Sequence, residues 1–186
     1  PILGIRGNDQ IFETSDSRKA EILNEYFSTI GEKLASELYS DQSLENSFSY
    51  ITRVTPTVTN IYLTYDSIMQ DLIKLKHNKT CGPDNIAPRL LKSAGHALIT
   101  LLFSLYSMSA SCNTVPSTWK FARVSALFKK DDETDKQNYR PISLLCVPGK
   151  LMETQVVSTI TNHVEYHNLR NKHQWAYKKG YSTELY

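Results

Sequence analysis

The strongest constraint on this chain is a pair of short apolar arms within residues 121–146. Residues 121–128 alternate apolar with polar side chains, and residues 139–146 do so again, which is typical of β-strands. The ten residues between the arms are all charged or polar. The pattern therefore predicts a β-hairpin. Pro141 is expected at an edge or a bulge, because proline lacks the N–H that a central ladder position needs.

Two permanent cations, Lys129 and Arg140, stand at the loop ends of the two arms. If the arms pair, both side chains project near one end of a small sheet. An arginine fork and a lysine point charge together suit a polyphosphate. On the hairpin pattern alone, however, solvated cations that only aid solubility are the simpler interpretation.

Apolar residues recur at steps of three and four in other segments, which predicts helices. We expect helices over residues 16–39, 64–77, 87–111 with a break near Gly95, and 150–167. Residues 40–60 have no such period and are interpreted as a linker. Thr64 is the expected cap of the second helix. Helices that precede a hairpin and follow it indicate an α+β fold.

Each of these predicted helices has its own set of inward-facing residues. They are Ala20, Leu23, Phe27, Ile30, Leu34 and Leu38; Ile68, Leu72 and Leu75; Leu90, Leu91, Leu98, Leu101, Leu102, Leu105 and Met108; and Leu151, Val156 or Val157, Ile160 and Val164.

Composition excludes several classes of protein. The 186 residues are 40% hydrophobic and 22% charged, as in globular proteins, and they contain no apolar run long enough for a transmembrane span. Three scattered cysteines argue against a disulfide framework or a zinc site and fit an intracellular, reducing compartment. Residues 81–186 carry thirteen Lys and Arg against eight Asp and Glu, so this half is the better candidate for a polyanionic partner.

Other clusters have simpler explanations than chemistry. Asp131, Asp132, Glu133 and Asp135 lie in the hairpin loop without the spacing of a calcium loop, so we interpret them as solvated charges. His163 and His167 share a helix face but lack the zinc-protease motif. We therefore expect no metal site. The basic, aromatic tail, residues 168–186, fits either base stacking or anchoring to the core.

Several sequence blocks follow one another in the second part of the chain. They are residues 78–85 (Asn-Lys-Thr-Cys-Gly-Pro-Asp-Asn) with 88–92, residues 114–120 with 123–124 and 127–130, residues 138–145 (Asn-Tyr-Arg-Pro-Ile-Ser-Leu-Leu), residues 149–153, and residues 173–184. Together, in this order, they resemble the reverse transcriptases of non-LTR (LINE-type) retrotransposons. Residues 138–145 resemble that family's most recognisable signature.

The resemblance implies the helix-rich fingers portion of a right-hand polymerase over residues 61–186, preceded by a helical connecting segment and linker over residues 1–60. Lys129 and Arg140 match the positions that contact the triphosphate of the incoming nucleotide. The resemblance also implies a set of residues that would contact the template or the primer. They are Lys79, Gly82, Asp84, Arg123, Lys130, Lys178, Lys179 and Ser182.

The chain departs from the family pattern at three positions. Asn85 replaces a glycine, which is tolerable if the turn needs only a positive φ, and Gly82 and Asn85 are the residues of this loop best able to adopt one. Ala176 also replaces a glycine, and Lys178 replaces an arginine and so loses a bidentate fork.

The resemblance also implies what this chain does not supply. The family's catalytic aspartates, which hold Mg²⁺, lie in a palm downstream, so no catalytic residue is expected here and the chain alone should not polymerise. The absence of an initiating Met indicates that the chain begins inside a longer polypeptide. Expected partners are an RNA template, a DNA primer, dNTP, and the palm and thumb of the polymerase, in the nucleus and cytoplasm, with no membrane. Alternatives are a non-enzymatic nucleic-acid-binding remnant and a helical interaction module.

Overall fold

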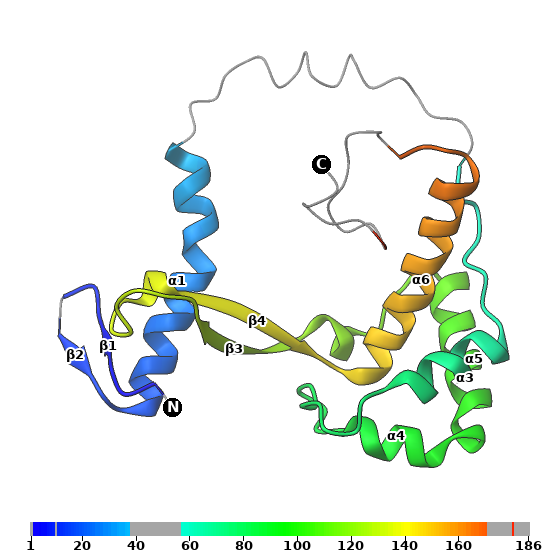
Figure 1. The fold of residues 1–186 in the computed structure, drawn as a ribbon, viewed down its shortest axis with the longest axis horizontal. Coiled ribbons are helices and arrows are strands. Elements are labelled where there is room, and N and C mark those ends of the chain that lie inside the picture. The colour runs from blue at the N-terminus through cyan, green and yellow to red at the C-terminus, as the bar shows by residue number, and fades with distance from the viewer. Residues whose placement is uncertain (1, 10, 38–56, 171–179, 181–186) are drawn as a thin grey trace. The chain divides into compact units, whose positions relative to one another are not determined.

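The computed structural model describes residues 2–9, 11–37, 57–170 and 180, drawn in colour in Figure 1. The described chain is α+β, as predicted, with helices and two two-stranded sheets. It divides into two compact units. The hairpin unit contains residues Pro1–Arg53 and Ala122–Leu144, and the helical unit contains Val54–Phe121 and Leu145–Tyr186.

The hairpin unit begins with β1 (Ile5–Arg6) and β2 (Phe12–Glu13), an antiparallel pair with Ile5 opposite Glu13. Helix α1 (Asp16–Glu37) follows, and β3 (Ala122–Phe128) then pairs with β4 (Tyr139–Leu145) through a loop that contains the 3-10 turn η2 (Lys136–Asn138). The predicted hairpin arms are thus confirmed. The small core consists of Ile5, Ile22, Leu23 and Tyr139, with Ile2, Phe27 and Ala126 packed against it.

The predicted apolar stripe of α1 is only partly correct. Leu23 is buried, but its buried neighbours on the helix are Lys19 and Ile22, while Ala20 and Leu34 are exposed. Lys19 can be buried because its ammonium donates to the Ile2 carbonyl at 2.6 Å and forms an ion pair with Asp16, one turn earlier on the helix. Only the first turns of α1 meet the core, so the rest of the stripe stays at the surface. Leu38 lies outside the described residues.

Within its described residues, the helical unit contains four α-helices and a 3-10 turn. They are α3 (Tyr65–Lys74), α4 (Pro88–Ala94), α5 (His96–Ser111), η1 (Ser117–Lys120) and α6 (Val147–Tyr166). Helix α3 lies against both α5 and α6 (Figure 1). Its start was predicted correctly, because the Thr64 side chain accepts a hydrogen bond from the Ser67 N–H as an N-cap. The core of this unit contains Ile68, Leu72, Leu91, Ile99, Leu102, Tyr106, Val147, Leu151 and Met152.

The break at Gly95 is confirmed, and this glycine has a φ of +48°. The predicted inward face of the following helix is partly wrong: Leu102 is buried, but Leu101 and Met108 are exposed. Tyr106 is buried instead, and its hydroxyl donates to the Pro148 carbonyl at 2.8 Å. Leu90, which was also predicted inward, is exposed on α4.

Among the described residues, no single helix is long and apolar enough to cross a membrane. Helices α4 and α5 pass that length and composition test only as a pair, bent by 107°.

The start of α6 also differs from the prediction. The helix begins at Val147 rather than Lys150, because Pro148 occupies its first turn, where no backbone N–H is needed. Its buried residues include Gln155 and Thr159, while Ile160, predicted to face inward, is exposed. Of the alternatives Val156 and Val157, Val156 is partly buried and Val157 is exposed. The inner face of α6 is therefore partly polar.

Candidate nucleotide and nucleic-acid interface

The register of the hairpin follows from two contacts near its loop. The Lys129 N–H donates to the Asn138 carbonyl at 2.8 Å, and the rings of Phe128 and Tyr139 lie 5.6 Å apart. Lys129 therefore stands opposite Asn138, and Arg140 stands opposite Leu127. Because side chains alternate between faces, Lys129 and Arg140 lie on the same face as diagonal neighbours.

The other face of the hairpin is the one that packs. Tyr139 is buried among Ile5, Ile22 and Leu23, and its hydroxyl donates to the Glu133 carbonyl at 2.7 Å. Burial raises the pKa of the Tyr139 hydroxyl, and the neighbouring carboxylates raise it further. The core thus fixes which hairpin face is turned outward.

The outward face combines cations with apolar side chains. By the same alternation Arg123 shares this face with Lys129 and Arg140, and all three residues are exposed. Leu127 and Ile142 lie between them and are also exposed. Such a face offers charge to phosphates and apolar contact to a base or a sugar.

The acidic residues of the loop have structural partners. The Asp132 carboxylate accepts from the Thr134 N–H at 2.8 Å and from its hydroxyl at 2.7 Å. These bonds, the backbone one first, lower the pKa of Asp132, and Arg6 lies 3.6 Å away as an ion pair. Asp135 accepts from the N–H of Gln137 and caps η2. The loop charges therefore shape the turn that holds Lys129.

Lys130 differs from its neighbour Lys129 in its surroundings. Its ammonium lies 3.7 Å from the Asp131 carboxylate, and both side chains are more than half exposed. Asp131 itself has a φ of +71°, an uncommon backbone conformation that aspartate tolerates better than most residues. An exposed pair of this kind is weak, so Lys130 can exchange Asp131 for a phosphate at little cost.

The second group of predicted contacts lies in the loop after α3, in the helical unit. Asn85 has a φ of +57°, as expected for the residue that replaces a glycine. Gly82 is not a positive-φ residue and serves a different purpose: a Cβ there would lie 2.5 Å from the Cys146 nitrogen and the Leu145 carbonyl carbon. Only glycine allows the loop to approach that backbone so closely.

The same loop is ordered by its own side chains. The Asp84 carboxylate accepts from the Ile86 N–H at 3.1 Å, while Lys79 is exposed. Cys146, beneath the loop, is buried, and burial raises the pKa of its thiol. Asp84 thus shapes the turn, and Lys79 is available to a ligand.

The structure brings together only some of the predicted residues. Lys129, Arg140, Arg123 and Lys130 belong to one hairpin, whereas Lys79, Gly82 and Asp84 belong to the helical unit. The predicted contacts Lys178, Lys179 and Ser182, and Ala176 among the departures, lie outside the described residues.

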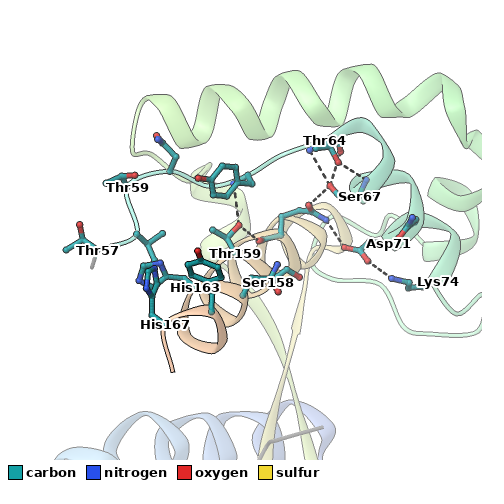
Figure 2. Close-up of a pocket in the computed structure, with 17 residues that line it drawn as sticks. Thr57, Thr59, Thr64, Ser67, Asp71, Lys74, Ser158, Thr159, His163 and His167 are labelled. Atoms are coloured by element: carbon teal, nitrogen blue, oxygen red, sulfur yellow. Dashed lines mark hydrogen bonds and ion pairs between the residues drawn. The ribbon is translucent and has the colours of Figure 1, made fainter. Parts of the chain in front are cut away.

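One feature of the helical unit was missed from the sequence. A groove of about 690 Å³ lies between α3, α6 and residues 57–62 (Figure 2). The available signal was polar: Gln155 and Thr159 stand four apart on the inner side of α6, where apolar residues were expected.

The described residues do not fit a magnesium site. No group of three or more His, Cys, Asp or Glu side chains among them could hold a metal ion. The sequence's consecutive aspartates, Asp131 and Asp132, lie in the hairpin turn, where Asp132 accepts the Thr134 hydrogen bonds.

No protein-family model matches the chain. Similar curated proteins include the probable RNA-directed DNA polymerase from transposon BS of Drosophila melanogaster, 27% identical over 119 residues that are 63% of this chain and 13% of that protein. The Retrovirus-related Pol polyprotein from type-1 retrotransposable element R1 of Bradysia coprophila is 29% identical over 124 residues, 66% of this chain and 12% of the relative. The probable RNA-directed DNA polymerase from transposon X-element of Drosophila melanogaster is 25% identical over 117 residues, 62% of this chain and 13% of that protein.

The match therefore covers about two thirds of this chain but only about an eighth of each relative. The chain is related in sequence to the RNA-directed DNA polymerases of retrotransposons.

Proposed function

We propose that this chain is part of the fingers of a non-LTR retrotransposon reverse transcriptase, a right-hand RNA-directed DNA polymerase. In this proposal residues 61–186 belong to the polymerase domain, and residues 1–60 form its connecting segment and linker. The chain contributes contacts to the incoming nucleotide and to template and primer. In this proposal the catalytic carboxylates and their Mg²⁺ belong to the palm of a longer polypeptide.

The observation that carries this proposal is the shared outward face of Lys129 and Arg140. The small core beneath Tyr139 holds this face toward solvent, and the loop hydrogen bonds hold the end at which both cations stand. The relatives' names supply the reaction class, RNA-directed DNA polymerase. Lys129 would supply a point charge and Arg140 a bidentate fork to phosphate oxygens.

The decisive measurement is binding of a fluorescent dNTP to the chain and its variants. Because each charge-assisted hydrogen bond contributes about 1.5–3 kcal/mol, Lys129→Gln and Arg140→Gln should each weaken binding by about tenfold or more. Arg140→Lys should lie between Arg140→Gln and the wild type, since it keeps the charge but loses the fork. Lys76→Gln is the matched control, because Lys76 is an exposed cation of the helical unit that is not among the predicted contact residues.

Unchanged affinity in Lys129→Gln and Arg140→Gln would contradict the nucleotide site. A primer-extension assay with Mg²⁺ tests the rest of the proposal: the chain alone should give no template-dependent product, and extension would show that it contains its own catalytic centre.

A non-enzymatic nucleic-acid-binding remnant would use the same cationic face, and binding distinguishes it from a polymerase part. A remnant should bind an oligonucleotide with a salt slope steeper than about −3 in log–log form yet show no preference for a triphosphate over a monophosphate. A nucleotide site should prefer the triphosphate.

A further inference from the structure

The proposed nucleotide site does not use the groove of the helical unit. Figure 2 shows Thr57, His163 and His167 at one end, and Ser67, Asp71 and Lys74 at the other. Most of the residues that line it are hydroxyl, amide or aromatic side chains.

The floor of this groove is a fixed polar network. Gln155 is 4% exposed; its amide nitrogen donates to Asp71 and its amide oxygen accepts from Ser67, each at 2.7 Å. The Tyr62 N–H donates to the Thr159 hydroxyl at 3.3 Å and so ties the incoming segment to α6. Because these buried groups satisfy one another, the floor is rigid and recognition falls to the rim.

The rim carries aromatic rings that are open to solvent. Tyr62 is 77% exposed and Tyr166 is 82% exposed, although both line the groove. The rings of His163 and His167 lie 4.6 Å apart on the same stretch of α6. The Tyr166 ring lies edge-to-face with the His167 ring, with centroids 4.8 Å apart, yet both tyrosines keep most of their ring surface open to solvent. Flat rings of a ligand can stack on such exposed surfaces.

The charge of the groove is nearly balanced. Asp71 is the carboxylate of the lining, and it pairs with Lys74 at 3.2 Å as well as with the buried amide. The rest of the lining includes the amides of Asn60, Gln70 and Asn162, which can both donate and accept. A phosphodiester backbone would therefore meet no uncompensated negative charge, and base edges would meet suitable hydrogen-bond partners.

We propose that this groove binds single-stranded nucleic acid, with bases stacked on Tyr62 and Tyr166 and their edges facing the rim amides. The inference rests on the proposed function, which favours a nucleic acid over the neutral oligosaccharide that a similar rim could also hold. It adds a second contact surface on the helical unit, one that works by stacking rather than by charge. The ligand's bases, and not its phosphates, supply most of the binding here.

The test measures the affinity for a labelled twelve-nucleotide oligo(rU) by fluorescence anisotropy at several salt concentrations. Tyr62→Ala and Tyr166→Ala should each weaken binding by about fivefold or more, since each removes a stacking surface. The slope of log K against log salt should stay that of the wild type, because no phosphate contact is lost. Phe121→Ala is the matched control: Phe121 is a 66% exposed aromatic of the same unit that does not line the groove, and its loss should leave binding unchanged.

Wild-type affinity in the Tyr62→Ala, Tyr166→Ala double variant would overturn the inference. If Lys129→Gln still weakened dNTP binding, the proposed nucleotide site would stand without the groove. Equal loss in Phe121→Ala, or competition by maltoheptaose as strong as by unlabelled oligo(rU), would also overturn it. Circular dichroism of each variant shows that the fold is retained, and Tyr166→Phe, which keeps the ring, should restore wild-type binding.

Discussion

The two units of this chain differ in how much core lies behind their surfaces. In the helical unit, α3, α4, α5 and α6 share one contiguous set of buried aliphatic and aromatic residues. In the hairpin unit, a smaller cluster around Tyr139 supports a two-stranded sheet, which alone would be marginal in water. The comparison indicates that the helices carry most of the stability, while the hairpin depends on turn hydrogen bonds to keep its cations in place.

The largest expected effect is in the helical core. Leu72 is fully buried on α3, so Leu72→Ala should lower the free energy of unfolding by about 2–5 kcal/mol. Its neighbour Ile73 is 57% exposed, and Ile73→Ala should change the free energy of unfolding by no more than about 0.5 kcal/mol. Urea denaturation followed by circular dichroism measures both. A similar loss in the two variants would mean that α3 is not anchored as described.

Two glycine-to-alanine substitutions, one in each unit, should change the free energy of unfolding in opposite directions. Gly82→Ala places a Cβ 2.5 Å from backbone atoms of residues 145 and 146, so we expect a loss of about 1–3 kcal/mol in unfolding free energy. Gly31→Ala lies within α1 with no atom within 4 Å of the added Cβ, and it should stabilise by about 0.5–1 kcal/mol through helix propensity. The same denaturation experiment checks both, and a neutral Gly82→Ala would show that the loop can move away.

Local signals in the sequence predicted much of the fold. Thr64 was identified as a helix cap and Gly95 as a helix break, because each acts on its own turn of backbone. The arms of the hairpin were found from their alternation alone. The sequence placed Lys129 and Arg140 only near one end of the sheet, and their shared face follows from the register that the structure gives.

Features that depend on distant partners were not predicted. Gln155 is buried because Ser67 and Asp71, more than eighty residues earlier, satisfy its amide. Lys19 is buried because the Ile2 carbonyl accepts a hydrogen bond from its ammonium. Gly82 and Asn85 were the residues best able to adopt a positive φ, but only Asn85 does so, and Gly82 is constrained instead by the close approach of a strand end far along the chain. No periodicity encodes such pairings.

The smallest expected effect is the response of Asp132 to acid. It tests the hairpin unit, which has the smaller core. The folded-state pKa of Asp132 lies below its ordinary value of 3.8, because the Thr134 N–H and hydroxyl donate to the carboxylate. The unfolded chain therefore takes up this proton first as the pH falls. The stabilisation that Asp132 gives is present above about pH 4 and is lost as the pH drops through the lowered folded value. Acid should thus loosen the hairpin turn before it affects the helical core.

Nuclear magnetic resonance of the backbone amides between pH 6 and 2 can separate the two units. In the wild type, the Thr134 amide should shift at the acid end and lose protection relative to its intrinsic exchange rate at each pH, while amides of α3 stay protected. Asp132→Asn should remove this acid response, because the amide cannot ionise. Asp131→Asn is the matched control: asparagine tolerates the positive φ there, and that carboxylate lies beside Lys130 rather than in the Thr134 turn, so the response should persist. A Thr134 response retained in Asp132→Asn would show that other groups hold the turn, and the argument that hairpin order rests on these bonds would fail.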